Sequence, residues 1–181
     1  MNAFWAYFWP IFGGGLTIGV IDGLAGFRAP RARPKDREAA IQRWHRRRLI
    51  VLLCGVAVAL AAAGLWNGPL GAANRLASRL ERDARLTLDS YEMTQVRARI
   101  HRGPITRQLV LSGPADDFQQ REIVRTMGTL PGVGGATWSA GSGGTPLIVE
   151  GAGASVLGFL IGLVLAYLVE LRRRYNAQWN W

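Results

Sequence analysis

Three apolar blocks alternate with polar segments along the chain. They cover residues 3–27, 49–66 and 147–171, and the second block contains no charged residue. A bilayer core about 30 Å thick is crossed by about 20 apolar residues in helical conformation. The first and third blocks reach this length and the second lies near its lower limit, so the pattern predicts three transmembrane helices.

The first block begins with an aromatic cluster and not with basic residues. The cluster is Phe4, Trp5, Tyr7, Phe8 and Trp9. Tryptophan and tyrosine gather at membrane–water interfaces, whereas a secretion signal begins with positive charge. We therefore interpret this block as a membrane span.

Positive charge around the blocks indicates their orientation. Residues 28–48 carry nine basic side chains, and the third block is followed by Arg172, Arg173 and Arg174. Short segments rich in Lys and Arg stay in the cytoplasm, whereas long segments cross the membrane largely regardless of charge. We therefore expect a multi-pass protein of a bacterial inner membrane, with the N-terminus outside, residues 28–48 as a cytoplasmic loop, residues 67–146 in the periplasm and a cytoplasmic tail of residues 172–181.

The segment of residues 67–146 has the pattern of a small α+β domain. Apolar residues at four-residue spacing predict a helix over residues 70–87, and alternation predicts a strand over 94–100. Short apolar runs predict strands at 109–111 and 133–138, separated by a helix over 116–130 whose buried side is Phe118, Ile123, Met127 and Leu130. The order is αββαβ, and the Gly/Ser-rich residues 139–145 follow as a flexible tether.

Three parts of this segment resemble the BON domain, a module of bacterial envelope proteins. They are LVLSG at 109–113, DDFQQREIVRTMGTL at 116–130 and PGV at 131–133, and the resemblance covers roughly residues 70–140. It implies contact with phospholipid or the cell envelope, and it does not imply catalysis.

The net charge of +10 narrows the class of partner. A basic chain is typical of proteins whose partner is nucleic acid or a membrane surface, and the long apolar blocks favour the membrane. The single cysteine, Cys54, excludes an intrachain disulfide and paired-cysteine metal sites. His45 and His101 lie outside the apolar blocks, and no nucleophile–base pair or phosphate-binding loop is present. We expect no catalytic residue, no metal and no cofactor.

Small residues recur every fourth position in two of the blocks. They are Gly15, Gly19 and Gly23 in the first, and Ala154, Gly158, Gly162 and Ala166 in the third. Such stripes let helix backbones approach closely in lipid. Two alternatives remain open: the two stripes pack against each other, or one of them docks onto another protein.

A second set of residues is expected at the membrane interfaces, in contact with lipid or with anionic phospholipid headgroups. It comprises Trp5, Trp9, Trp44, Arg46, Arg47, Arg48, Trp66, Arg172, Arg173, Arg174, Trp179 and Trp181. Asp22 is a possible polar site within the membrane, either on a proton path or simply close enough to the cytoplasmic end to reach water or an arginine.

These features favour a non-catalytic accessory subunit that stabilises a larger membrane protein complex through other integral membrane subunits. The alternative is a free-standing envelope protein that binds phospholipid or the cell-wall layer through its BON-like domain.

Overall fold

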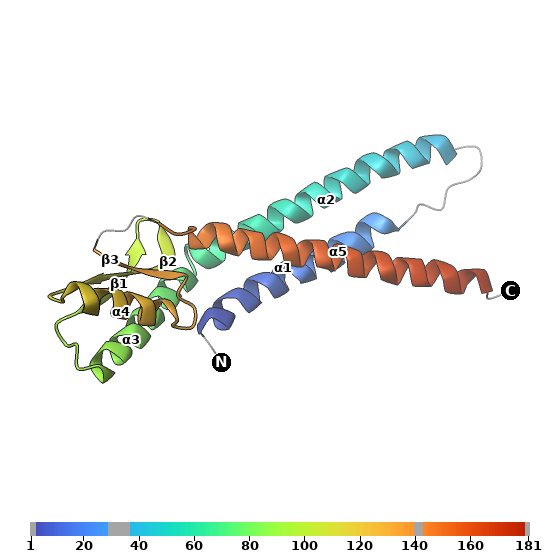
Figure 1. The fold of residues 1–181 in the computed structure, drawn as a ribbon. Coiled ribbons are helices and arrows are strands. Elements are labelled where there is room, and N and C mark those ends of the chain that lie inside the picture. The colour runs from blue at the N-terminus through green and yellow to red at the C-terminus, as the bar shows by residue number, and fades with distance from the viewer. Residues whose placement is uncertain (1–2, 29–36, 140–142, 180–181) are drawn as a thin grey trace. The chain divides into compact units, whose positions relative to one another are not determined.

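The computed structural model describes residues 3–28, 37–139 and 143–179 (Figure 1). Over these ranges the chain divides into two compact units. One unit comprises Met1–Trp9 and Gly64–Gly151, and the other comprises Pro10–Ala63 and Ala152–Trp181. We call them the α+β unit and the helical unit.

The long helices are α1 (Ala3–Phe27), α2 (Arg37–Asn67) and α5 (Leu147–Trp179). Each is long and apolar enough to cross a membrane, over Phe4–Phe27, Ala40–Asn67 and Leu147–Ala177. The prediction of three potential spans is therefore confirmed.

Two helix boundaries differ from the prediction. α2 begins at Arg37, inside the segment expected to be a basic loop, because the residues before position 49 are mostly good helix formers without proline or glycine. α5 continues past Leu171 to Trp179. There Glu170 pairs with Arg173 and Arg174 at three- and four-residue spacing, which stabilises a helix.

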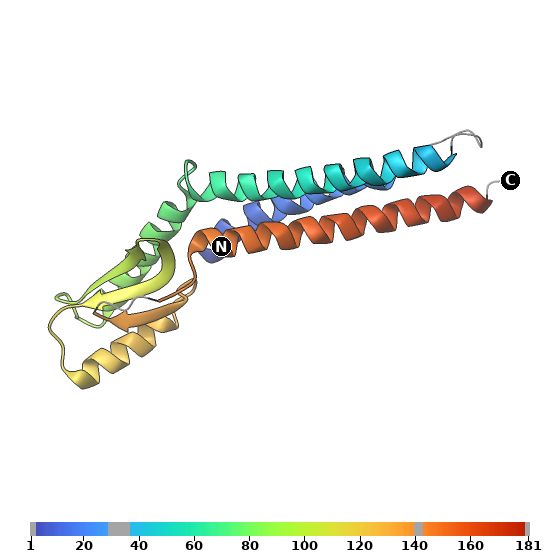
Figure 2. The ribbon, with the colours of Figure 1, turned by 90° about the horizontal axis from the view of Figure 1, so that it is seen from above.

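In the helical unit, α1 and α5 lie in backbone contact through the two small-residue stripes (Figure 2). A Cβ atom added at Gly15 or Gly19 would overlap the backbone of Ser155 or Phe159. On the other side, a Cβ at Gly158 would overlap the Phe12 carbonyl.

Most of the remaining stripe residues also lie in the contact between α1 and α5. Gly162 lies against the backbone of Leu16, and Gly23 lies against Ala166, whereas Ala154 is half-buried. Of the two alternatives, the structure shows the one in which the stripes pack against each other.

α2 packs against α1 and α5 through a glycine of its own and through a hydroxyl group of α5. Gly55 of α2 lies against Asp22 and Phe159. Ser155 Oγ donates a hydrogen bond to the carbonyl of Ala59, at 2.9 Å. The outward sides of α2 and α5 carry large exposed apolar side chains, as expected for lipid-facing surfaces.

The α+β unit contains a three-stranded sheet. Its strands β1 (Arg97–Arg102), β2 (Ile105–Ser112) and β3 (Gly135–Trp138) stand in the order β1-β2-β3. β1 and β2 are antiparallel, whereas β2 and β3 are parallel and are connected through α4 (Asp117–Gly128). With α3 (Ala72–Ser90) in front, the predicted order αββαβ is confirmed.

Both shorter helices cover the same face of the sheet (Figure 1). Leu76, Leu80 and Leu88 of α3 and Ile123 and Met127 of α4 are buried. From the strands, Ile100, Leu109 and Leu111 complete this core.

The assignment of Phe118 to the buried side of α4 was wrong, because its side chain is 68% exposed. Asp116 caps α4 by accepting from the Gln119 N–H at 2.7 Å, and Ile123 and Met127 then face the sheet. Phe118 stands five residues before Ile123, well off the stripe that repeats every three or four residues. Leu130 follows the helix and is half-buried.

The contact between α1 and α5 can be tested with two glycines of α1. Gly19→Ala should destabilise the protein by about 1–3 kcal/mol, because the new Cβ meets the Phe159 backbone and α5 has to move. Gly14→Ala is the control, since a Cβ there meets nothing within 4 Å. Thermal unfolding in one detergent, followed by circular dichroism, measures both, and equal midpoints would contradict the packing.

Candidate functional site

The face of the sheet opposite α3 and α4 carries two neighbouring arginines. Strand alternation places Arg97 and Arg99 of β1 on this face. They pair in register with Ser112 and Val110 of β2, and Val110 pairs in turn with Thr137 of β3. We call these five residues the open sheet face.

Positive charge on the open sheet face is not neutralised within the described part of the chain. Neither Arg97 nor Arg99, both exposed, forms an ion pair with a described residue, and no member of the face is acidic. Arg102, at the end of the same strand, does form an ion pair: its Nη2 atom lies 2.8 Å from Glu81 Oε2. The open sheet face can therefore receive a negatively charged partner.

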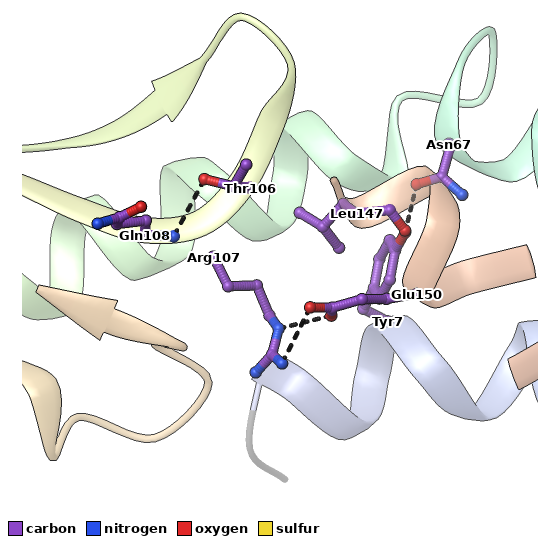
Figure 3. Close-up of polar contacts among 7 residues, drawn as sticks. All are labelled: Tyr7, Asn67, Thr106, Arg107, Gln108, Leu147 and Glu150. Atoms are coloured by element: carbon purple, nitrogen blue, oxygen red, sulfur yellow. Dashed lines mark hydrogen bonds and ion pairs between the residues drawn. The ribbon is translucent and has the colours of Figure 1, made fainter. Parts of the chain in front are cut away.

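The opposite side of β2 is tied to the first turn of α5 by an ion pair (Figure 3). Arg107 donates from Nε and Nη2 to the Glu150 carboxylate, at 2.7 and 3.1 Å. Both side chains are about four-fifths buried. The Arg107 guanidinium also lies 5.2 Å from the ring centre of Phe4 on α1. No sequence pattern pointed to a pairing of Glu150 with Arg107, so this ion pair is a finding of the structure.

A second polar contact joins the ends of the long helices within the α+β unit (Figure 3). The buried Tyr7 hydroxyl donates to Asn67 Oδ1, and it lies 3.3 Å from the Leu147 carbonyl. The start of α1, the end of α2 and the start of α5 therefore meet at one buried hydroxyl group.

A groove of about 530 Å³ runs between α4 and the edge strand β3. Trp138 and Val124 supply its apolar surface, and the polar side is formed by Asp117, Gln120, Arg121 and Arg125. A volume of this size is in the range of ligand-binding sites, so the groove is a second candidate surface.

The aromatic residues predicted at the outer interface lie in different surroundings. Trp5 and Trp9 are exposed and stacked, with ring centres 5.7 Å apart. Trp66 is half-buried, and the Arg75 guanidinium lies 6.0 Å from its ring centre. The exposed pair is suited to the headgroup level of a membrane.

The residues predicted at the inner interface lie in the helical unit. Trp44 is half-buried beside Arg47 and Arg48, and Arg46 is exposed. In α5, Arg172 is exposed, whereas Arg173 and Arg174 pair with Glu170 as described above. The side chain of Trp179 and all of Trp181 lie outside the described residues.

Asp22 lies inside the helical unit. Its Oδ2 atom is buried and makes no hydrogen bond to a described residue. It lies against Gly55, and it does not reach an arginine among the residues that the structure describes. Asp22 as a whole is half-buried, so one carboxylate oxygen is shielded by neighbouring helices while both interpretations of the residue stay predictions.

Sequence reasoning missed the open sheet face, the partner of Glu150 and the groove beside Trp138. The open sheet face could have been found from the sequence, because Arg97 and Arg99 alternate with Ala98 and Ile100 in a predicted strand. The other two depend on which strand and helix ends come together, and a single sequence carries no sign of this.

The fold defines a class: a chain with three potential membrane-spanning helices and a small mixed α+β domain. No protein-family model, curated protein or solved structure matches this chain. The BON-like character of the domain consequently stays a prediction.

The ion pair between Arg107 and Glu150 should contribute measurably to stability. In a double-mutant cycle with Arg107→Gln and Glu150→Gln, we expect a coupling energy of about 1–2 kcal/mol, because the pair is bidentate and largely buried. Arg125 and Glu122 form the control cycle: they are 4.0 Å apart and exposed, and should couple by less than about 0.5 kcal/mol. Chemical unfolding in detergent gives both energies, and equal couplings would refute a structural role for the pair.

Proposed function

We propose that the chain is a non-catalytic protein of a bacterial inner membrane, and that it is an accessory subunit which stabilises a larger membrane complex. Its α+β domain, BON-like in sequence, stands in the periplasm. The observation that carries the proposal is the open sheet face, where two exposed arginines lack an acidic partner among the described residues.

A surface with two unpaired like charges is electrostatically unfavourable by itself. Two like charges on adjacent positions of one strand face repel each other, and an acidic partner converts this repulsion into attraction. The flanking Val110 and Thr137 are half-buried and give the same face an apolar part. A mixed surface of this kind is typical of contacts between protein subunits.

The helical unit supports an anchoring role. The small-residue stripes of α1 and α5 are occupied by each other, so these helices can form a self-sufficient anchor for the domain. A further subunit in the membrane would then contact the large exposed apolar side chains of α2 and α5, such as Leu53, Val58 and Leu168.

A second candidate function is a free-standing envelope protein that binds phospholipid or the cell-wall layer. The groove between α4 and β3 favours it, because Trp138 and two arginines line one accessible hollow, with Asp117 as its one acidic lining residue among those described. Arg121 and Arg125 would bind phosphates or carboxylates there, and Trp138 would pack against an apolar or sugar surface.

The proposed orientation is testable with the single cysteine of the chain. In a Cys54→Ser background, Ser112→Cys places a thiol on the open sheet face, and Tyr175→Cys places one near the end of α5. A membrane-impermeant maleimide should label the first in intact spheroplasts and the second only after permeabilisation. The reverse pattern would contradict the orientation.

Membership of a complex is tested by extraction in mild detergent at endogenous expression, followed by native-mass measurement. We expect a discrete assembly much heavier than the 19.8 kDa chain. Arg97→Glu with Arg99→Glu should weaken the assembly by about 2 kcal/mol or more, because attraction at the open sheet face becomes repulsion.

The control for this experiment is Arg79→Glu with Arg82→Glu, which changes the same charge on exposed positions of α3. It should leave the assembly intact. A monomer or small homo-oligomer that carries only lipid would rule out the accessory-subunit proposal and leave the envelope-binding one.

A further inference from the structure

The helical unit contains a basic pocket where α1 ends and α2 begins. The pocket has a volume of about 350 Å³ and is lined by Arg28, Arg47 and Arg48 together with Trp44 and Gly26. Among the residues that the structure describes, no acidic one lines it. Three arginines thus line one hollow.

The pocket is held in shape by contacts of its own residues. The Trp44 indole N–H donates to the Arg28 carbonyl at 3.0 Å, which joins the end of α1 to α2. The Arg48 guanidinium lies 4.9 Å from the ring centre of Phe27 and 5.7 Å from that of Trp44. Two aromatic rings therefore position one of the three cations.

The arginines of the pocket have no anionic partner among the described residues. In the same unit, Arg173 and Arg174 share Glu170, so arginines there do form ion pairs where a carboxylate is in reach. Gathering three unpaired cations is unfavourable unless an anion joins them. A phosphate group is the anion whose geometry suits several guanidinium groups.

The place of the pocket along the helices indicates which phosphate it would receive. The apolar span of α1 ends at Phe27, and the charge-free part of α2 begins at Leu49, so the pocket lies where the helices leave the apolar core. Lipid headgroups occupy this level, and tryptophan prefers it. Exposed Leu49 and Ile50 continue from the pocket along α2 and offer an apolar surface to acyl chains.

We propose that this pocket binds the headgroup phosphate of an anionic phospholipid as a discrete, saturable site. Arg28 and Arg47 contact the phosphate, Arg48 is positioned by its two rings, and Trp44 holds Arg28 in place. The inference requires that the helices cross a membrane, and it is independent of any partner complex and of the orientation.

The test measures the affinity of the purified full-length protein for phosphatidylglycerol, by native mass spectrometry with phosphatidylcholine as the reference lipid. Arg28→Gln with Arg47→Gln should weaken binding of the first phosphatidylglycerol about thirtyfold, since a basic residue near a membrane surface contributes about fivefold. Arg46→Gln with Arg172→Gln removes the same charge from exposed positions outside the pocket, and affinity should change less than about twofold.

Trp44→Phe provides a second measurement that keeps every charge. It removes the N–H that holds the Arg28 carbonyl, and affinity should fall by about threefold to tenfold, within the range of one lost hydrogen bond. Thermal unfolding adds a check on folding: phosphatidylglycerol should raise the midpoint of the wild type and of the Arg46/Arg172 control, and leave that of the Arg28/Arg47 variant unchanged.

Three results would overturn the proposal. Equal losses in the two double variants would mean that the attraction is diffuse charge. Equal affinity of the wild type for phosphatidylglycerol and phosphatidylcholine would mean that the pocket does not select anions. Displacement of the lipid by inorganic phosphate at the same concentration would mean that the site takes a free anion and not a headgroup.

Discussion

The helical unit depends on one constraint, the close approach of the α1 and α5 backbones. Inside lipid, apolar side chains gain little by leaving one apolar environment for another, so helices associate by fitting their surfaces together. Glycine at positions 15, 19, 158 and 162 removes the side chains that would keep the two backbones apart. α2 packs against them in the same way at Gly55, and the Ser155 hydroxyl of α5 adds a directed hydrogen bond.

The α+β unit is held by a different force, the burial of leucine-rich helix faces on one side of a small sheet. Three strands and two helices form a modest core, and the ends of the long helices extend it. The pair of Arg107 and Glu150 and the hydroxyl of Tyr7 fix those ends by directional contacts. A largely buried ion pair fixes which groups meet, because either charge buried without its partner would be strongly destabilising.

Arginines fall into two groups, and the difference guides the functional proposals. Those paired with carboxylates, such as Arg102, Arg107 and Arg174, contribute to the structure of their own unit. Those of the open sheet face and of the basic pocket have no acidic partner among the described residues. The first group stabilises the fold, whereas the second lies on the two surfaces for which we propose a protein partner and a lipid headgroup.

The sequence by itself determined the three long apolar helices and the order of elements in the small domain. These follow from local rules, namely the length of apolar runs and the periods of 3.6 and two residues, which each segment carries within itself. It also identified the small-residue stripes, but it left open what they face. Only the tertiary structure decided that the stripes face each other, that Glu150 meets Arg107, that Asp22 lies against Gly55, and that Arg28, Arg47 and Arg48 line one pocket. Each of these contacts joins residues far apart in the chain, and their meeting depends on how helices and strands pack, which no local pattern encodes.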